Sequence, residues 1–271
     1  MTENNQVLVI MPTYNEADNI ETMTARLLSV LPQASLLVVD DGSPDGTGEI
    51  ADCLAAADQR VQVLHRSVKA GLATAYVTGF KWGLERNFDV LVEMDADGSH
   101  QPEELPRLLA ALEEADMVKG SRWTRGGTVV DWTKRRQWLS RGANIWIQVV
   151  MDLPIHDSTG GYNLYRAGFL RTIDLDDIAV TGYAFQIDMT RRVIEAGGVV
   201  REVPIEFQER LAGQSKMDTG IMVEALQQTV VWGAQKRAAQ LKDLLAKAYD
   251  QVRPLTEKIV AQAARGFRLP D

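Results

Sequence analysis

Two carboxylates one residue apart are the most informative feature of this chain. Asp95 and Asp97 flank Ala96 and come directly after the apolar run at 90–94. Such a run predicts a buried strand, so both carboxylates are expected where that strand gives way to a loop. Carboxylate oxygens are the ligands that hard divalent cations prefer. The spacing indicates a metal site, although Asp is also common in loops and helix caps.

Two more polar loops follow apolar runs earlier in the chain. The sequence PTYNE at 12–16 follows the run at 7–11, and DDGSPDGT at 40–47 follows the run at 36–39. Ligands of open α/β sheets bind in the crevice outside the carboxyl ends of the strands. Three polar strand ends at one crevice therefore suggest a nucleotide-sugar site.

The elements that must position these loops alternate along the first 122 residues. Strands are expected near 7–11, 36–40, 61–65, 90–95 and 116–121, and helices near 17–31, 45–57, 71–86 and 102–114. This alternation predicts an α/β fold with a mostly parallel central sheet flanked by helices. No Gly-x-Gly-x-x-Gly follows the first strand and no Gly-Lys-Ser/Thr loop is present, which argues against dinucleotide dehydrogenases and P-loop NTPases.

The rest of the chain predicts a loop, several helices and one more strand. The loop is expected at 124–134, helices at 135–151, 185–196, 221–248 and 254–264, and a strand at 199–206. We expect one catalytic domain over residues 1–220 and a C-terminal helical extension over 221–271.

Composition excludes several classes of protein. Among 271 residues, 45% are apolar, enough for a sizeable core, and the single Cys53 excludes a disulfide framework. No stretch approaches the roughly 18 apolar residues needed to span a bilayer, and the N-terminus does not resemble a secretory signal. We therefore expect a cytosolic or peripheral protein. The net charge of −8 argues against nucleic acid as a partner.

A basic segment stands out against this acidic background. Residues 119–141 hold seven Lys or Arg side chains and one acid, and the segment includes or adjoins Trp123, Trp132, Trp138 and Trp146. Indoles prefer the headgroup boundary and bases are attracted to anionic lipid, so we expect a face that docks on a membrane surface. Each tryptophan alone could equally be a core residue. The basic tail from 234 onward is expected to be a second interfacial helix or a partner-binding one.

The ordered motifs PTYNE, DDGSPDGT, DADGSH (95–100), GSR (120–122) and DSTGGY (157–162) resemble the family 2 glycosyltransferases, and within them the dolichol or polyprenol monophosphomannose synthases. The resemblance runs from about Val7 to Lys216. It implies a GT-A, Rossmann-like fold. It also implies metal-dependent transfer of mannose from GDP-mannose to polyprenyl phosphate, with inversion, at the inner, cytoplasmic face of the cell membrane.

The resemblance also implies roles for individual residues. Asp95 and Asp97 would hold Mg²⁺ or Mn²⁺, beside Ala96. Ser99 stands where some relatives supply a Gln amide to the metal, and His100 is either a further ligand or a loop residue. The nucleotide would be bound by residues from three loops: Pro12, Tyr14, Glu16, Val39, Asp41 and Lys69.

Cations would hold the phosphates. Arg122, Arg210 and Lys216 are implied to contact the diphosphate or the acceptor phosphate, so the catalytic set is Asp95, Asp97, Arg122 and Arg210. A phosphate acceptor is already ionised at neutral pH and needs no general base. Asp157 and Asp188 are therefore assigned to sugar orientation or to loop architecture.

Other functions remain open at this point. The nearest is the same fold using UDP-glucose to make polyprenyl phosphoglucose. A sugar-1-phosphate nucleotidyltransferase would need a Gly-rich, Lys-containing signature after the first strand, which is absent. A non-enzymatic docking module would be favoured if Asp95, Asp97 or Arg122 were missing, and all are present. An integral membrane protein is a further expected partner, because relatives of this type often carry or recruit membrane-spanning segments.

Overall fold

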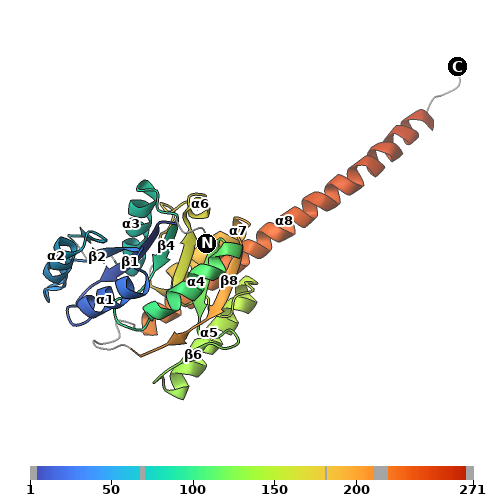
Figure 1. The fold of residues 1–271 in the computed structure, drawn as a ribbon. Helices are drawn as coiled ribbons and strands as arrows, with labels where there is room; N and C mark the ends of the chain where they lie inside the picture. The colour runs from blue at the N-terminus through green and yellow to red at the C-terminus, as the bar shows by residue number, and fades with distance from the viewer. Residues whose placement is uncertain (1–4, 68–70, 181, 210–218, 267–271) are drawn as a thin grey trace.

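A single mixed sheet forms the centre of the molecule (Figure 1). The computed structural model describes residues 5–67, 71–180, 182–209 and 219–266. Within them the sheet has seven strands in the order β3-β2-β1-β4-β7-β5-β8. Their bounds are β1 (Val7–Thr13), β2 (Ser35–Asp40), β3 (Val61–His65), β4 (Val90–Glu93), β5 (Met117–Ser121), β7 (Asn163–Arg166) and β8 (Val200–Pro204).

Helices cover both faces of this sheet, as expected for a largely parallel arrangement. They are α1 (Ile20–Val30), α2 (Thr47–Ala57), α3 (Leu72–Glu85), α4 (Leu105–Ala111) with flanking 3₁₀ turns η1 (Pro102–Glu104) and η2 (Leu112–Glu114), α5 (Lys134–Met151), α6 (Ala167–Leu170) and α7 (Tyr183–Glu195). Successive residues of β1 point to opposite faces. Val9 packs in the core with α1 and α4, whereas Leu8 packs in the core with α3 and α7.

The predicted α/β class and the first five strands are confirmed, but one strand of this central sheet was not predicted. β7 lies antiparallel between β4 and β5, while every other pairing in this sheet is parallel. The reversal places Asn163 opposite both Glu93 and Lys119. A strand of four residues just after a Gly-Gly turn carries too little periodicity to be recognised from sequence.

The segment expected to be a loop at 124–134 contains a short strand. β6 (Thr128–Val129) pairs in parallel with β9 (Glu206–Phe207) in a second, two-stranded sheet. The single strand expected at 199–206 is therefore divided, with Ile205 buried between β8 and β9. This small sheet brings Phe207 and the loop after β5 together.

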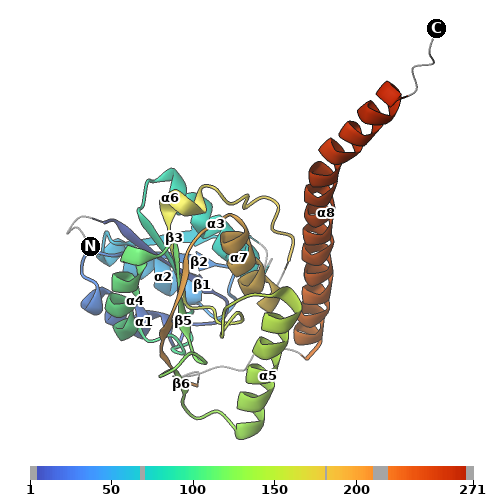
Figure 2. The same cartoon turned by 90° about the vertical axis from the view of Figure 1, so that its right-hand side faces the viewer.

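The prediction of two C-terminal helices is wrong, because α8 (Thr219–Gly266) runs through Pro254 as one helix. A proline costs its helix one backbone hydrogen bond, and Figure 2 shows that the outer part of α8 bends. The inner part of α8 packs against α5 and α7 through buried Ala225 and Trp232. The outer part projects away from the sheet (Figures 1 and 2). None of the helices in the described ranges combines the length and the apolar character needed to cross a membrane.

Candidate functional site

The three predicted polar loops meet at one cavity of ≈ 450 Å³. The carboxyl ends of β1, β2 and β4 and the start of α3 form one side of it, and the start of α7 and the end of β5 contribute to the rest. Nine of the predicted site residues line this cavity: Pro12, Tyr14, Glu16, Asp41, Asp95, Ala96, Asp97, Ser99 and Arg122.

Hydrogen bonds between the first two loops hold one side of the cavity together. The backbone N–H of Glu16 donates to Thr47 Oγ1 at 2.9 Å, and that of Ala17 donates to Asp45 Oδ2 at 3.1 Å. Asp45 Oδ1 also accepts from the backbone N–H of Thr47 at 3.1 Å, and Asp45 lies one residue before Gly46, which is the N-cap of α2. Asn19 Nδ2 donates to Glu16 Oε2 at 2.9 Å and so orients the carboxylate that faces the cavity.

The second loop presents Asp41 rather than Val39 to the cavity. Asp41 is 6% exposed and forms an ion pair with Arg66 at 3.1 Å. Val39 is wholly buried in the core beneath the cavity and lies opposite Pro12 in the β1–β2 register. The structure therefore places Val39 as support for the loop, with its side chain away from the cavity lining.

The two carboxylates after β4 are each oriented by a hydroxyl. Asp95 Oδ1 accepts from the Tyr76 hydroxyl at 2.9 Å, and Asp97 Oδ1 accepts from Ser99 Oγ at 2.6 Å and from its backbone N–H at 3.0 Å. Burial, together with the charge of Asp95, raises the pKa of Tyr76 well above its usual value, so Tyr76 remains a donor. Ser99 thus acts on Asp97 in this structure.

His100 supports the same loop from behind. Its Nδ1 accepts a hydrogen bond from the backbone N–H of Asp95 at 3.0 Å, and its ring stacks on Tyr162 with the centroids 4.7 Å apart. Because Nδ1 is used for the backbone, it is not a metal ligand in this arrangement. The contact favours the loop role for His100 over the ligand role.

The carboxylates of Asp95 and Asp97 fit a divalent cation whose remaining coordination positions are filled by substrate oxygens. No group of three or more His, Cys, Asp or Glu side chains with metal-binding geometry occurs within the described residues. Asp95 and Asp97 nevertheless line one wall of the cavity. Mg²⁺ is commonly held by one or two carboxylates together with substrate phosphates, so this pair is suited to a metal–diphosphate complex.

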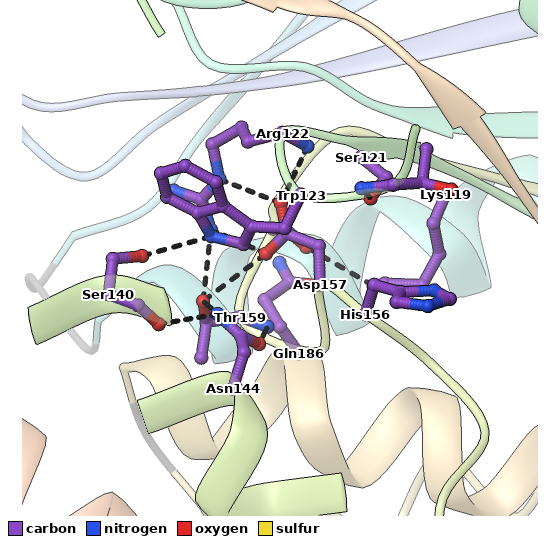
Figure 3. Close-up of polar contacts among 12 residues, drawn as sticks. Lys119, Ser121, Arg122, Trp123, Ser140, Asn144, His156, Asp157, Thr159 and Gln186 are labelled. Carbon is purple, nitrogen blue, oxygen red and sulfur yellow. Dashed lines mark hydrogen bonds and ion pairs between the residues drawn. The ribbon is translucent and has the colours of Figure 1, made fainter. Parts of the chain in front are cut away.

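Arg122 reaches the cavity from the end of β5 and is held by Asp157 (Figure 3). Arg122 Nε and its backbone N–H donate to Asp157 Oδ2 at 2.7 and 2.9 Å, and Nη2 donates to Oδ1 at 2.6 Å. Burial alone would raise the pKa of Asp157, but the charge and hydrogen bonds of Arg122 outweigh it and keep that pKa below its ordinary value. Asp157 does not line the cavity, so it positions Arg122.

A buried polar network lies beneath this pair. Asn163 Oδ1 accepts from Lys119 Nζ at 2.7 Å, and Asn163 Nδ2 donates to Glu93 Oε2 at 2.7 Å. Burial raises the pKa of Glu93 to about 7 and lowers that of Lys119 to about 8, against the attraction between their charges. Lys119 is 0% exposed. Counting it among bases that face a membrane is therefore wrong.

Aromatic side chains surround Arg122 and a second arginine that was not assigned from sequence. The Arg136 guanidinium lies 3.8 Å from the Trp132 ring centroid and forms an ion pair with Glu209 at 2.5 Å. Arg136, Trp132, Glu209 and Phe207 all line the cavity. In the sequence, Arg136 and Trp132 belong to the basic, Trp-containing segment, and Phe207 and Glu209 belong to the run FQER at 207–210, which is part of the family resemblance.

The tryptophans of this segment fall into two groups. Trp123 and Trp132 pack edge-to-face with their centroids 6.3 Å apart, and both lie within 6 Å of the Arg122 guanidinium. Trp138 and Trp146, on α5, are 75% and 46% exposed. Trp123 and Trp132 are half-buried beside Arg122, and the exposed tryptophans lie on α5, so the expected docking face is reduced to α5.

Besides Val39 and Asp157, four predicted site residues lie away from the cavity or outside the described ranges. Asp188 is 1% exposed, pairs with Arg191 and Arg192 at 2.5 and 2.8 Å, and does not line the cavity. Its carboxylate forms ion pairs within α7 and stabilises that helix. Lys69, Arg210 and Lys216 lie outside the described residues.

Comparison with known proteins identifies the family of this chain. Residues 8–174 match the family described as "Glycosyl transferase family 2". The chain is 51% identical over 232 residues to "Undecaprenyl-phosphate mannosyltransferase" of Micrococcus luteus, covering 86% of this chain and 96% of that protein. It is 52% identical over 234 residues to "Polyprenol monophosphomannose synthase" of Mycolicibacterium smegmatis, covering 86% and 88%.

Solved structures share the fold at low identity. Mannosyl-3-phosphoglycerate synthase from Rubrobacter xylanophilus superposes with a TM-score of 0.64 at 18% identity, over 87% of this chain and 75% of that one. Glucosyl-3-phosphoglycerate synthase from Mycobacterium tuberculosis, solved with Mn²⁺, UDP and phosphoglyceric acid, superposes with a TM-score of 0.61 at 18% identity, over 86% and 78%. Because the family model matches residues 8–174 and two relatives are about half identical over 86% of the chain, the chain belongs to glycosyl transferase family 2.

Proposed function

We propose that this protein transfers mannose from GDP-mannose to a polyprenyl phosphate, releasing GDP and polyprenyl phosphomannose. The observation that carries the proposal is the cavity itself, which places Asp95, Asp97 and Arg122 at one set of strand ends in a chain half identical to two named polyprenyl-phosphate mannosyltransferases. The nucleotide is assigned to the loops of Glu16 and Asp41, and the diphosphate to the two carboxylates after β4.

The leaving diphosphate needs positive charge. We assign Mg²⁺ or Mn²⁺ to Asp95 and Asp97, where the ion would neutralise charge that develops on the leaving group. Arg122 supplies a fixed cation on the same cavity, and its fork geometry suits phosphate oxygens. Because Asp157 already fixes its orientation, Arg122 would need little rearrangement during the reaction.

The acceptor phosphate is assigned to the side of the cavity formed by Arg136 and Trp132. Arg136 is paired with Glu209, at side-chain exposures of 41% and 40%, so an incoming phosphate can compete with that carboxylate in partly solvated surroundings. The phosphate oxygen would attack the anomeric carbon from the face opposite the diphosphate, with inversion. Asp157 and Asp188 are both engaged by arginines, which supports a reaction that uses neither as a general base.

Peripheral association with a membrane, at the inner face of the cell membrane, is part of the same proposal. On α5, Trp138, Ile145 and Val149 are 75%, 60% and 69% exposed and recur at helical spacing along one stripe. Exposed Lys134, Arg135 and Arg141 accompany that stripe. The exposed apolar side chains of the outer part of α8 are assigned to a second lipid contact or to an integral membrane partner.

A donor panel tests the proposal. The purified protein is incubated with polyprenyl phosphate in vesicles, Mg²⁺ or Mn²⁺, and one nucleotide sugar at a time, and lipid products are identified by mass spectrometry. GDP-mannose should give the fastest turnover. A clear preference for UDP-glucose would replace mannose with glucose in the proposal, and absence of any glycolipid product would contradict it.

A further inference from the structure

Gln186 places an amide in the cavity wall that its own surroundings do not satisfy. It lies in the first turns of α7, is 3% exposed and lines the cavity. Its Oε1 accepts a hydrogen bond from Asn163 Nδ2 at 2.6 Å. Its Nε2 is buried and makes no hydrogen bond of ordinary geometry with the residues that the structure describes. A buried donor without a partner is unfavourable unless a ligand supplies one.

The buried network determines which end of the Gln186 amide is left over. Lys119 has only donors, so its contact with Asn163 must be to the carbonyl oxygen Oδ1. Asn163 therefore points its Nδ2 towards Gln186, and the Gln186 atom that accepts this hydrogen bond must be Oε1. The assignment of oxygen and nitrogen thus follows from the lysine, and Nε2 is the unsatisfied end.

One neighbouring carboxylate accounts for part of the capacity of this amide. Burial raises the pKa of Glu93, and Gln186 is among the groups that oppose this rise. That contact is a side-chain hydrogen bond to Glu93 whose geometry at Nε2 is poor. An amide nitrogen carries two N–H groups, so at least one remains for a ligand.

The position of Nε2 indicates which part of a ligand it would meet. A Cβ atom placed on Gly161 would lie 3.6 Å from Gln186 Nε2 and 3.6 Å from His100 Cε1. His100 in turn accepts from the backbone of Asp95. The amide therefore lies close to the carboxylate loop but on α7, whereas the nucleotide loops belong to β1 and β2. A donor that enters along those loops would present its sugar here, beyond its diphosphate.

We propose that Gln186 is a specificity-determining residue whose Nε2 donates a hydrogen bond to one hydroxyl oxygen of the transferred sugar. The inference rests on the proposed function for the identity of the donor. Sugar hydroxyls accept such bonds readily, and a site built around a buried polar group rejects analogues that lack the matching hydroxyl. Mannose and glucose differ only in the configuration of one hydroxyl, so a fixed amide can contribute to choosing between them.

A set of deoxy donors tests this role. Wild type and Gln186→Met are compared on the preferred nucleotide sugar and on its single-deoxy analogues, by kcat/KM and by calorimetric Kd. For one analogue the wild-type kcat/KM should fall about 10-fold or more, whereas Gln186→Met should treat that analogue and the parent within about 2-fold. The Kd of the nucleoside diphosphate alone should stay within about 2-fold of wild type, because it lacks the sugar.

Two further variants separate recognition from folding. Gln186→Leu offers neither a donor nor an acceptor to a sugar hydroxyl, so it should lose discrimination as Gln186→Met does. Gln62→Met, at an exposed position on β3 away from the cavity, should keep the wild-type pattern. Unchanged discrimination in both Gln186 variants, or a parallel loss of nucleoside diphosphate binding, would overturn the inference.

The same experiment distinguishes this inference from the proposed function. If wild type prefers a donor other than GDP-mannose, the proposed function fails while the deoxy series on the preferred donor still tests Gln186. If wild type transfers no sugar, the Kd comparison remains. In that case equal loss of affinity for the deoxy analogues in wild type and variant would overturn the role of Gln186.

Discussion

At the scale of single residues, the site depends on the guanidinium of Arg122, which the buried carboxylate of Asp157 holds in place. Arg122 and Asp157 have side-chain exposures of 6% and 0%. Removing one partner of such a pair leaves a buried charge without compensation, which typically costs about 3–5 kcal/mol. The orientation of the cavity arginine and part of the folding stability are therefore linked.

We expect Asp157→Asn to lower the free energy of unfolding by about 3–5 kcal/mol at neutral pH and to reduce turnover, because Arg122 loses its ionic partner. Denaturant titration measures the stability. The pKa of Asp157 is lowered, so its contribution is complete above its unfolded pKa and is lost as pH falls through the folded pKa. The gap between variant and wild type should therefore narrow in acid. Glu257→Gln, in an exposed pair with Arg253, serves as the control and should change little.

Glu93 provides a pH test of the buried network. Its pKa is raised to about 7. At pH values between the ordinary pKa and 7, the folded protein therefore binds a proton that the unfolded chain does not. The stability that comes from the protonated Glu93 is lost as the pH rises through 7. Glu93→Gln lacks this dependence. Between pH 5 and pH 8 its stability relative to wild type should rise by up to about 3 kcal/mol, as measured by denaturant titration at both pH values. A difference that is the same at both would contradict the buried, proton-linked state of Glu93.

Sequence alone predicted the residues that stand at strand ends but not those that reach the cavity through tertiary contacts. Asp95 and Asp97 follow an apolar run, and strand direction then determines their place. Gln186 and Arg136 lie on helices, where their sequence neighbours give no sign of a cavity. Asp157 and Asp188 looked similar in sequence. Asp157 pairs with Arg122, which lines the cavity, whereas Asp188 pairs with Arg191 and Arg192 one turn along its own helix.

At the scale of elements, α5 and α8 form one unit beside the sheet. Gly233 of α8 lies so close to α5 that a Cβ atom there would be 2.3 Å from the carbonyl oxygen of Val150. Lys236 Nζ donates to the carbonyl oxygens of Met151 and Asp152 at 3.0 and 2.8 Å, satisfying the C-terminal end of α5. The close approach of the two helices requires a glycine at this crossing.

Gly233→Ala should therefore force α8 away from α5 and lower the free energy of unfolding by about 1–3 kcal/mol, because backbone cannot give way to the new methyl group. Gly142→Ala is the matched change in α5, where a Cβ atom would have nothing within 4 Å. It should raise the stability by about 0.5–1 kcal/mol through helix propensity. Thermal and denaturant unfolding of both variants measures the contrast, and equal effects would contradict the crossing.

The exposed stripe of α5 makes a prediction about lipid. Trp138→Ser with Ile145→Ser should weaken co-sedimentation with anionic liposomes at both low and high salt, because apolar contact is not screened. Lys134→Gln with Arg135→Gln should weaken it by up to about 2 kcal/mol in low salt and less in high salt. Arg136 is left intact because it lines the cavity.

Val199→Ser, at a position 50% exposed before β8, is the control and should bind liposomes as wild type does. If both α5 variants also sediment as wild type does, with folding intact by circular dichroism, α5 does not dock the protein. Attachment would then have to come from the outer part of α8 or from a partner protein.

The elements themselves were predictable in proportion to their periodicity. Long amphipathic helices such as α5 and buried strands such as β2 were expected within a residue or two of their bounds. β7 was missed because its pairing with β4 and β5 is decided by contacts more than forty residues away. α8 was divided at Pro254 because proline usually ends a helix, whereas here the helix accommodates it with a bend.

At the scale of the whole molecule, an acidic protein of net charge −8 has to handle two phosphate-bearing substrates. The positive charge is concentrated at the cavity, which Arg122 and Arg136 both line. The nearby carboxylates Asp95 and Asp97 lie where a bound cation can reverse their charge. α5 runs from the edge of this cavity, where Arg136 lies, and presents its exposed stripe outward. A lipid phosphate could thus reach the cavity from a surface on which α5 rests.

The most direct test of this account is product formation by wild type and Asp97→Ala. With GDP-mannose, polyprenyl phosphate vesicles and Mg²⁺ or Mn²⁺, wild type should form polyprenyl phosphomannose, detected by mass spectrometry. Asp97→Ala, or wild type in excess EDTA, should form it at least about 100-fold more slowly, in line with losing several kcal/mol of charge stabilisation. Full activity of Asp97→Ala, or undiminished activity in EDTA, would contradict the assignment of this cavity as a metal-dependent mannosyltransferase site.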